Sequence, residues 1–463
     1  MENLLHKKVR FFVKKLSFLF ILLMLSSGLV FSQTVDTVTT NADDGAGSLR
    51  QTIADALDGD TIVFDGVDTI YVGTPLLLGD KTLTIDGTGV SLDGRLFGTD
   101  ADSDRILTVT GVTDKVVKLM NLTVQHGFDK DTTGNYLLTV NGGGGLQVNN
   151  ELGGIFIAEN CTFQFNDANA RGGAVRAYGH TNADNVSFLG CDFIQNNVLL
   201  EANDGGAVGA DFATFTNCLF EGNIAPDVGG AMVIDTLTTV INCDFVSNTG
   251  AKGGAIKTAD STNIVSGCYF TLNHATNQGG GIFVVGGIIS DCVLEYNTCD
   301  DDGAGLYIKG SGIATGLTIR NNKAGDHSGG VYLNYGSLRN SIVTENVCAD
   351  DGGGVYVTRT TDVVENCLIT NNTAVDLGGG IMIFRDGSAI NNVVDGNSTE
   401  GKGGGVYIDG KDDLVADFIG NVITNNEASD EGGGIYVEIG NIINCTVADN
   451  IAANEGGGVR GDN

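Results

Sequence analysis

Thirteen phased copies of one short motif constrain the fold of this 463-residue chain more than any other feature. Each copy sets glycines directly before an apolar residue, as in GGGV at 352–355. The apolar residues that end the copies, 24 to 33 residues apart, are Leu146, Val175, Val208, Met232, Ile256, Ile282, Leu306, Val331, Val355, Ile381, Val406, Ile435 and Val459. A period this short is typical of solenoids, in which each repeat packs only on its neighbours.

A second motif precedes the glycines in most copies. CTFQFN at 161–166 and CYFTLN at 268–273 are clear examples, and the Asn that ends it usually lies nine residues before the apolar residue. Between the motifs lie short alternating runs such as GLYIKG and GLTIRN, bounded by Gly, Asn and Asp, which predict strands and turns. The leucine ladder of leucine-rich repeats is absent, and helical repeats are longer and poor in glycine. The repeat therefore predicts an all-β fold, a parallel β-helix with about three short strands in each coil.

The glycine runs are explained by sharp corners between strands. Glycine reaches left-handed dihedrals without a clash, and it leaves room where stacked corners press backbone against backbone. In the strand after the corner, Val355 and Val357 are expected to face inward and Tyr356 outward. Arg176 and Lys257 hold the same position as Tyr356 in other coils, which indicates a side that faces solvent. The repeated asparagines are expected to stack in an internal ladder that bonds to the turns.

The paired motifs resemble those of a known family. GGAV at 172–175 and 205–208 and GGAI at 253–256, with FQFN, FIQN, FEGN, FVSN and FTLN, resemble the repeats of chlamydial-type polymorphic outer-membrane proteins. The resemblance covers about residues 140–463, and later copies drift to GGG[IV] and [IV]xxN. It implies a right-handed parallel β-helix displayed on a cell surface, with adhesion as its usual role.

Residues 1–32 have the pattern of an export signal, because five basic residues precede an apolar run from Leu16 to Phe31. An uncleaved membrane anchor is the alternative, although the run is short for a span. Removal of this segment takes five of 25 Lys and Arg and one of 57 Asp and Glu, leaving a net charge of 20 minus 56, or −36. Such a surface argues against nucleic acid and anionic lipid as partners. We expect an exported protein, secreted or on the cell surface or outer membrane, with no membrane span in the mature chain.

Residues 33–110 are expected to form an N-terminal cap and the first coils. Ser48 can N-cap a short helix in which Leu49, Ile53 and Leu57 share one face. That helix covers core and strand edges at the open end of the first coil. Residues 111–463 form the β-helix repeats of the same single domain. The chain stops inside a repeat, so we expect the C-terminal end to be incomplete.

Eight of the ten cysteines occupy one repeat position, which holds Leu317 in another coil. The eight are Cys161, Cys191, Cys218, Cys243, Cys268, Cys292, Cys367 and Cys445. In-register neighbours about 4.8 Å apart are poorly placed for disulfides, so a stack of buried thiols is favoured over a disulfide framework. Cys299 and Cys348 share another position and lie two coils apart. No histidine accompanies the cysteines at zinc-ligand spacing, so no zinc site is expected.

The residues directly before the glycines, at the outer corners of the coils, are candidates for a catalytic or metal site. They include Lys252, Gln278, Leu377 and Lys402, a mixture typical of solvated corners and unlike a calcium ladder. Asp302, His327 and Asp351 do fall on three consecutive coils and can form a small carboxylate–imidazole cluster, but a solvated corner is the favoured interpretation. The sequence predicts no catalytic residue, no metal ligand and no cofactor.

One row of residues on the expected outer face is apolar in seven consecutive coils. Its members are Phe283, Tyr307, Tyr332, Tyr356, Met382, Tyr407 and Tyr436. Stacked aromatics can simply stabilise the sheet. Alternatively, the six aromatic residues form a flat, exposed strip that binds sugar rings or a partner protein. We therefore expect a surface adhesin or binding scaffold for a glycan or surface protein, without enzymatic activity. The alternative is a carbohydrate-active enzyme, either a polysaccharide lyase or a glycoside hydrolase.

Overall fold

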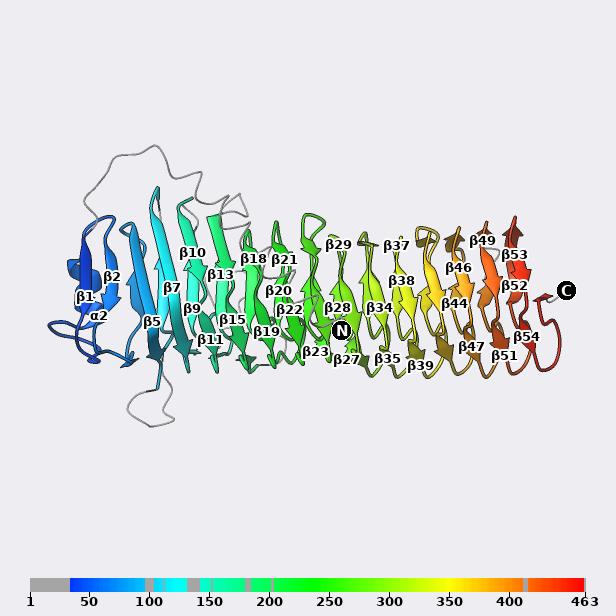
Figure 1. Cartoon of the computed structure of the whole chain (residues 1–463), viewed down its shortest axis with the longest axis horizontal. Helices are drawn as coiled ribbons and strands as arrows, with labels where there is room; N and C mark the ends of the chain where they lie inside the picture. The colour runs from blue at the N-terminus through cyan, green and yellow to red at the C-terminus, as the bar shows by residue number, and fades with distance from the viewer. Residues whose placement is uncertain are drawn as a thin grey trace, which may run out of the picture.

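The computed structural model describes residues 34–95, 104–110, 113–130, 142–150, 153–179, 185–200, 204–410 and 415–461. The predicted export signal at 1–32 lies outside these residues. The described strands form coils that follow one another along a single long axis in sequence order, as Figure 1 shows. Each strand pairs in parallel with the equivalent strand of the next coil, as β32 does with β36. The predicted parallel β-helix is confirmed.

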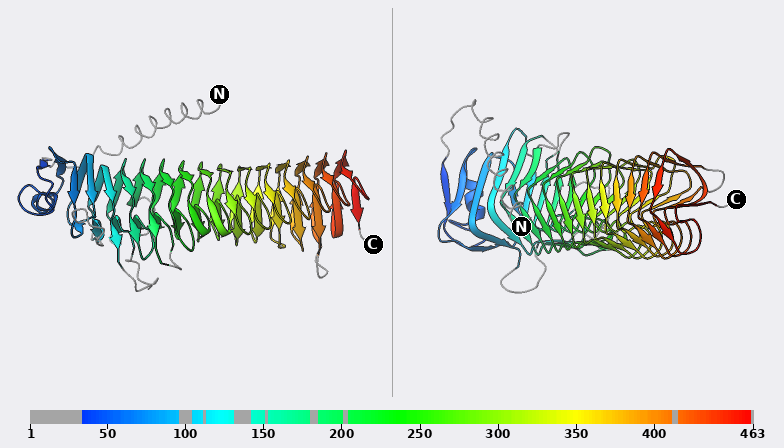
Figure 2. Two further views of the ribbon diagram at one scale, coloured as in Figure 1. Left: turned by 90° about the horizontal axis from the view of Figure 1, so that it is seen from below. Right: turned by 45° about the vertical axis from the view of Figure 1, so that its right-hand side comes forward.

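A typical coil contributes four short strands to three sheets. After the glycine corner comes a strand of sheet B, then two consecutive strands of sheet A, then a very short strand of sheet C. The two further views in Figure 2 show the coils stacked one on another along the long axis. Their inward side chains form one continuous core along the solenoid.

Sheet B follows the glycine corner and carries the candidate site. Its strands are β4 (Leu76–Leu78), β6 (Leu107–Thr110), β9 (Leu146–Asn149), β13 (Val175–Tyr178), β17 (Val208–Asp211), β20 (Met232–Ile234), β24 (Ile256–Thr258), β28 (Ile282–Val284), β32 (Leu306–Lys309), β36 (Val331–Asn334), β40 (Val355–Val357), β44 (Ile381–Phe384), β48 (Val406–Asp409), β52 (Ile435–Ile443) and β55 (Val459–Gly461). The long strand β52 continues from sheet B into sheet A.

Sheet A has two strand rows, and the long strands β5 and β7 run through both. The first row contains β1 (Val35–Val38), β2 (Thr61–Phe64), β5 (Leu83–Asp93), β7 (Val116–Gln125), β10 (Ile155–Glu159), β14 (Val186–Leu189), β18 (Thr214–Thr216), β21 (Thr239–Ile241), β25 (Ile264–Ser266), β29 (Ile288–Ser290), β33 (Ile313–Thr315), β37 (Ser337–Arg339), β41 (Val363–Glu365), β45 (Ser388–Ile390) and β49 (Ala416–Ile419). The second row adds β3 (Thr69–Tyr71), β11 (Thr162–Gln164), β15 (Asp192–Ile194), β19 (Leu219–Glu221), β22 (Asp244–Val246), β26 (Tyr269–Thr271), β30 (Val293–Glu295), β34 (Thr318–Arg320), β38 (Ile342–Thr344), β42 (Leu368–Thr370), β46 (Val393–Asp395), β50 (Val422–Thr424) and β53 (Thr446–Ala448).

Sheet C consists of two- to five-residue strands just before the glycine corner. They are β8 (Phe128–Asp129), β12 (Asp167–Ala168), β16 (Asn197–Val198), β23 (Thr249–Lys252), β27 (His274–Gln278), β31 (Thr298–Cys299), β35 (Lys323–Ala324), β39 (Val347–Cys348), β43 (Thr373–Ala374), β47 (Ser398–Thr399), β51 (Glu427–Ala428) and β54 (Ile451–Ala452). The corner residues that follow these strands therefore stack coil on coil as well.

The predicted cap helix is present as α2 (Leu49–Asp55). Ser48 caps it, because its Oγ accepts a hydrogen bond from the backbone N–H of Gln51 at 3.2 Å. Leu49 is buried and Ile53 packs against the core. The prediction is wrong for Leu57, which is 68% exposed. The helix has ended two residues earlier, so Leu57 no longer shares its apolar face.

The predicted asparagine ladder runs through twelve successive coils. In each step the side-chain Nδ2 donates to Oδ1 of the next asparagine, as from Asn297 to Asn322 at 3.0 Å. The same Oδ1 accepts the backbone N–H of Asn297 at 2.9 Å, and Nδ2 also donates to the carbonyl of Phe270 at 3.1 Å. The members are Asn166, Asn196, Asn223, Asn248, Asn273, Asn297, Asn322, Asn346, Asn372, Asn397, Asn426 and Asn450. Each inner asparagine side chain thus satisfies a backbone N–H and a backbone carbonyl of the preceding coil, and so fixes the register between the two coils.

The glycine corner combines a left-handed residue with close backbone stacking. Gly352 has φ +68°, which an L side chain rarely adopts. A Cβ on Gly354 would lie 2.6 Å from the carbonyl oxygen of Gly380 in the next coil and 2.9 Å from Nδ2 of Asn372. The corner therefore excludes side chains for two separate reasons, as the sequence predicted.

Gly354→Ala should destabilise the protein by about 2 kcal/mol, because its Cβ overlaps atoms of the coil stacked on it. Gly458 holds the same repeat position, but there the nearest atom to an added Cβ is Cγ1 of Val447 at 3.7 Å. Gly458→Ala should change stability by less than about 0.5 kcal/mol. Chemical denaturation of both variants measures this difference, and equal losses would contradict the stacked corner.

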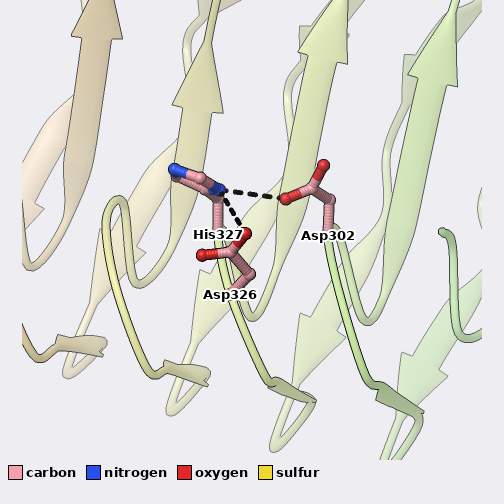
Figure 3. Close-up of side chains that lie close together, drawn as sticks. All are labelled: Asp302, Asp326 and His327. Atoms are coloured by element: carbon pink, nitrogen blue, oxygen red, sulfur yellow. Dashed lines mark hydrogen bonds and ion pairs between the residues drawn. The ribbon is translucent and has the colours of Figure 1, made fainter. Parts of the chain in front are cut away.

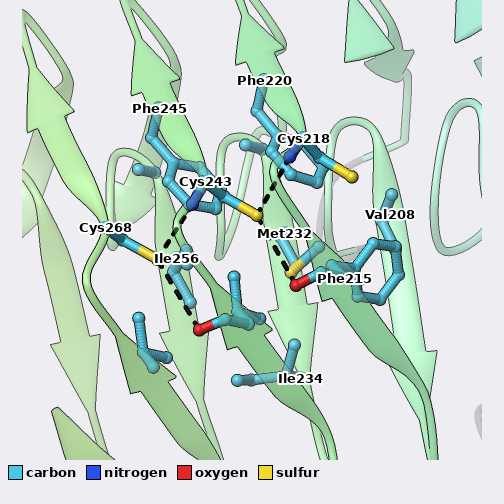
Figure 4. Close-up of a cluster of buried hydrophobic side chains, with 14 of the residues drawn as sticks. Val208, Phe215, Cys218, Phe220, Met232, Ile234, Cys243, Phe245, Ile256 and Cys268 are labelled. Carbon is cyan, nitrogen blue, oxygen red and sulfur yellow. Dashed lines mark hydrogen bonds between the residues drawn. The ribbon is translucent and has the colours of Figure 1, made fainter. Parts of the chain in front are cut away.

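All ten cysteines are free thiols, nine of them buried and Cys445 partly so, and the eight predicted ones share one repeat position, whereas Cys299 and Cys348 lie in a separate cluster. The backbone N–H of Cys218 donates to Sγ of Cys243 at 3.4 Å, and Cys243 donates likewise to Cys268 at 3.4 Å. Figure 4 shows this row beside stacked Phe220 and Phe245, whose ring centroids are 4.7 Å apart. The sulfur atoms act here as small core groups.

A thiol titration without reductant should find close to ten free thiols in the denatured protein and very slow reaction of the nine buried ones in the native protein. Burial explains the slow native reaction, because the reagent needs an accessible thiolate. Finding most cysteines paired after denaturation would contradict the stack.

Candidate functional site

The predicted row on the outer face of sheet B is in register through seven coils. Phe283 pairs with Tyr307, Tyr307 with Tyr332, and Tyr332 with Tyr356. The row continues through Met382, Tyr407 and Tyr436. Ring centroids of stacked neighbours lie 4.6 to 5.3 Å apart, and Met382 interrupts the stacking. We call this row of seven residues the tyrosine ladder.

The expectation that these rings are exposed is wrong. Their planes lie within 16° of one another, so each ring covers the face of the next. Exposed fractions are 4% for Tyr307, 7% for Tyr356 and 1% for Tyr436, and only Tyr332 is partly exposed. Leu377 and Phe384 pack against the same rings. Sugar rings cannot stack on these faces, which leaves ring edges and hydroxyl groups for a ligand.

The hydroxyl groups of the ladder differ in their partners. That of Tyr407 donates to Glu438, and that of Tyr436 accepts a hydrogen bond from Nζ of Lys402 at 3.1 Å. Within the described part of the chain, the hydroxyls of Tyr332 and Tyr356 have no hydrogen-bond partner. Burial, followed by nearby tyrosine and aspartate side chains, raises the pKa of both hydroxyls. They therefore stay protonated and available as donors.

A cluster of five ionisable residues adjoins the ladder at the corner between sheets C and B. It comprises Asp302, Asp326, His327, Asp350 and Asp351 from three consecutive coils, and we call it the His327 cluster. Nδ1 of His327 lies 3.0 Å from Asp302 and 3.3 Å from Asp326, as Figure 3 shows. Nε2 faces Asp350 at 3.4 Å and Asp351 at 3.9 Å. The imidazole is thus placed between two pairs of carboxylates.

The cluster contacts the tyrosine ladder directly. The ring of His327 meets that of Tyr356 edge-on with centroids 4.8 Å apart, and Tyr332 lies at 6.4 Å. The sequence placed Asp302, His327 and Asp351 on successive coils but favoured a solvated corner. The structure brings all three together, with side chains 13% to 25% exposed. Asp326 and Asp350 were missed, although each directly precedes a predicted member in the sequence.

The protonation of the cluster follows from its crowding. Burial alone lowers the pKa of His327, but the hydrogen bond to Asp302 and the charges of Asp326 and its neighbours raise it to about 9. Burial and the charge of Asp350 raise the pKa of Asp351 to about 7, although His327 opposes the shift. Burial also raises the pKa of Asp326. At neutral pH the cluster holds an imidazolium among carboxylates that outnumber it.

The cluster has the donor atoms of a metal site, although the sequence predicted none. In each of two triads, one donor atom per residue lies within 4.8 Å of the others. One triad is Asp302, Asp326 and His327, and the second is His327, Asp350 and Asp351.

Toward the N-terminal end, the same face of sheet B carries ion pairs in place of aromatic rings. Arg176 was expected to face solvent, but it is 5% exposed and pairs with Asp211 at 2.8 Å. Arg171 pairs with Asp204 and Asp235 beside it. These neighbours enclose the guanidinium of Arg176, so a charged residue at this position does not mark an open surface.

Comparison of the sequence with models of known protein families finds a match. The family described as right handed beta helix region matches residues 180–347 and 304–461, which together span more than half of the chain. The chain belongs to the right-handed β-helix family. The right-handed coiling that the sequence resemblance implied is supported by this family match. No helix among the described residues is long and apolar enough to cross a membrane.

Two solved structures are similar to this protein at low sequence identity. One is PfbA, a surface adhesin of Streptococcus pneumoniae, with 12% identity, a TM-score of 0.28 and 91% of both chains covered. Another is a mutant of the PL6 family alginate lyase AlyGC, with 9% identity, a TM-score of 0.26, and 92% of this chain and 98% of that chain covered. Among curated proteins, no sequence matches significantly.

The His327 cluster should make this β-helix protein more stable as the pH falls from about 9 to about 6.5. The folded pKa of His327 lies above its ordinary value of 6.5, so its stabilising charge is complete below pH 6.5 and is lost as the pH rises through about 9. Asp351 acts in the same direction but at lower pH: its folded pKa of about 7 lies above the ordinary value of 3.8, so its destabilising effect develops as the pH rises from about 4 to about 7 and is constant above that. Denaturation with a chelator present, at several pH values, measures this dependence.

His327→Gln is the matched variant for this measurement. The stability difference between parent and variant should be largest near pH 6.5 and shrink toward pH 9 and above. A difference that is constant across this range would contradict a charged His327 in the folded state.

Proposed function

We propose that this β-helix protein is an exported binding scaffold, of the adhesin kind, that holds an extended ligand against the outer face of sheet B. The observation that carries the proposal is the pair of unpartnered hydroxyls on Tyr332 and Tyr356 beside the His327 cluster. Donors and carboxylate acceptors on rigid, in-register coils form a pre-organised polar surface. Pre-organisation lowers the entropic cost of binding.

A glycan is the ligand class that this surface suits best. Its hydroxyl groups can accept from Tyr332 and Tyr356 and donate to the exposed oxygens of Asp326 and Asp350, whose side chains are 43% and 41% exposed. The carboxylates of the cluster repel polyanionic chains, which favours a neutral or amino-sugar glycan. Contacts repeat from coil to coil, so several weak contacts add along one extended chain.

Export and surface display are part of this proposal. The basic and apolar pattern of residues 1–32 supports export, and the high negative charge is compatible with an extracellular surface. The resemblance to chlamydial-type repeats supports adhesion at a cell surface. A surface protein that presents such glycans would be an equivalent partner.

Glycoside hydrolysis is the second candidate, and Asp351 is the observation that favours it. A carboxyl group with a pKa near 7 is a suitable proton donor for glycosidic bond cleavage. Release of reducing ends from neutral polysaccharides, abolished in Asp351→Asn, would favour the enzyme over the scaffold.

The double variant Tyr332→Phe and Tyr356→Phe should lose glycan binding by at least tenfold and keep its stability. Phenylalanine preserves the stacked rings and removes only the two hydroxyl donors, each worth about 1 kcal/mol. Binding is measured on an array of neutral and amino-sugar glycans, and stability by thermal denaturation.

Tyr296→Phe is the control, because Tyr296 is 51% exposed on a coil of the same region but lies outside the ladder. It should bind like the parent. If the double variant also binds like the parent, the ligand lies elsewhere on the solenoid and the proposal fails. If the double variant unfolds, the two hydroxyls have a structural role and the proposal fails as well.

A further inference from the structure

We propose that the His327 cluster binds one divalent transition-metal ion, with Zn²⁺ as the best fit, through Nδ1 of His327 and the carboxylates of Asp302 and Asp326. The site does not depend on the glycan proposal, because it is defined by its own donor atoms.

The donor atoms are already close to the spacing of a coordination sphere. Nδ1 of His327 lies 3.0 Å from Oδ1 of Asp302 and 3.3 Å from Oδ2 of Asp326. Ligands bound at about 2.0–2.2 Å to one tetrahedral ion are separated by roughly 3.3–3.6 Å. The oxygens of Asp302 and Asp326 lie within 4.8 Å of each other, so an ion that replaces the proton on His327 can draw all three ligands together. Figure 3 shows the three side chains converging from two neighbouring coils.

A second observation separates this cluster from an ordinary group of surface acids. Nε2 of His327 points at a different carboxylate pair, 3.4 Å from Asp350 and 3.9 Å from Asp351. Metal-bound histidines typically donate their second ring N–H to a carboxylate, which orients the ring and makes the first nitrogen a better ligand. Asp350 and Asp351 are placed for that positioning role.

The donor chemistry selects the class of ion. Imidazole suits zinc and its transition-metal neighbours, whereas Ca²⁺ and Mg²⁺ prefer oxygen ligands alone. Three protein ligands leave one position open, and the side chain of Asp326 is 43% exposed, so an ion can reach the site from solvent. Asp301 adds negative charge beside Asp302 and Asp326. A dication offsets this excess charge.

The test uses the full chain, freed of metal with a chelator and titrated with Zn²⁺ alone by isothermal calorimetry. We expect one ion per chain, with no competition from Ca²⁺ or Mg²⁺ at the same concentration. His327→Gln and Asp326→Asn should each weaken binding at least tenfold. Asp350→Asn should weaken it by about 10- to 100-fold as a positioning residue.

His274→Gln is the matched control. His274 stands two coils before His327 on β27, its side chain is 34% exposed, and its Nε2 lies 3.8 Å from Asp300. This variant should bind Zn²⁺ like the parent. The buried thiols are common to all variants, so any binding to them is the same throughout.

Absence of Zn²⁺ binding to the parent would overturn the proposal. So would equal binding by the parent, His327→Gln and Asp326→Asn. The side chain of Asp326 is partly exposed, so Asp326→Asn should fold normally and keeps the test valid even if the His327 variant is unstable. Glycan binding is measured separately, so a failure of either proposal is recognised independently.

Discussion

The hydrogen bonds between stacked asparagines are the interaction on which the rest of the structure depends. Asn322 accepts from the side chain and the backbone of Asn297, and it donates to Asn346 and to the carbonyl of Leu294. These groups are buried, and buried polar groups without partners are costly. A coil displaced by one residue would lose all of these bonds at once, so the ladder sets one register for every coil.

This register explains why the two candidate sites, the tyrosine ladder and the His327 cluster, lie on the outside of the solenoid. Inward positions repeat because they serve stacking, as the phenylalanine, cysteine and asparagine rows show. Outward positions need only fit their neighbours, so they vary along the solenoid. On the outer face of sheet B, the earlier coils carry the ion pairs around Arg176 and the later coils carry the tyrosine ladder. The His327 cluster arises in the same way, because residues about 25 positions apart meet when corners stack.

Much of the fold was readable from the repeats, since each structural role recurs at a constant spacing. The same repetition placed the tyrosine ladder and three members of the His327 cluster in register. Exposure was not predictable for Tyr356 or Arg176, because it depends on ring orientation and on neighbours from other coils. Asp326 and Asp350 were missed because each lies one residue before the repeat position, held by His327 and Asp351, at which the corner residues were compared. Leu57 was misplaced because a helix end depends on local backbone geometry.

The stability of Asn322→Ala tests the role of the asparagine ladder most directly. Removing the side chain leaves the backbone N–H and the Nδ2 of Asn297 without their buried acceptor, so the loss should exceed about 3 kcal/mol. Asn277→Ala, at an exposed position on β27, should change stability by less than about 0.5 kcal/mol. Equal stability of the two variants in chemical denaturation would contradict the claim that the ladder holds the coils in register.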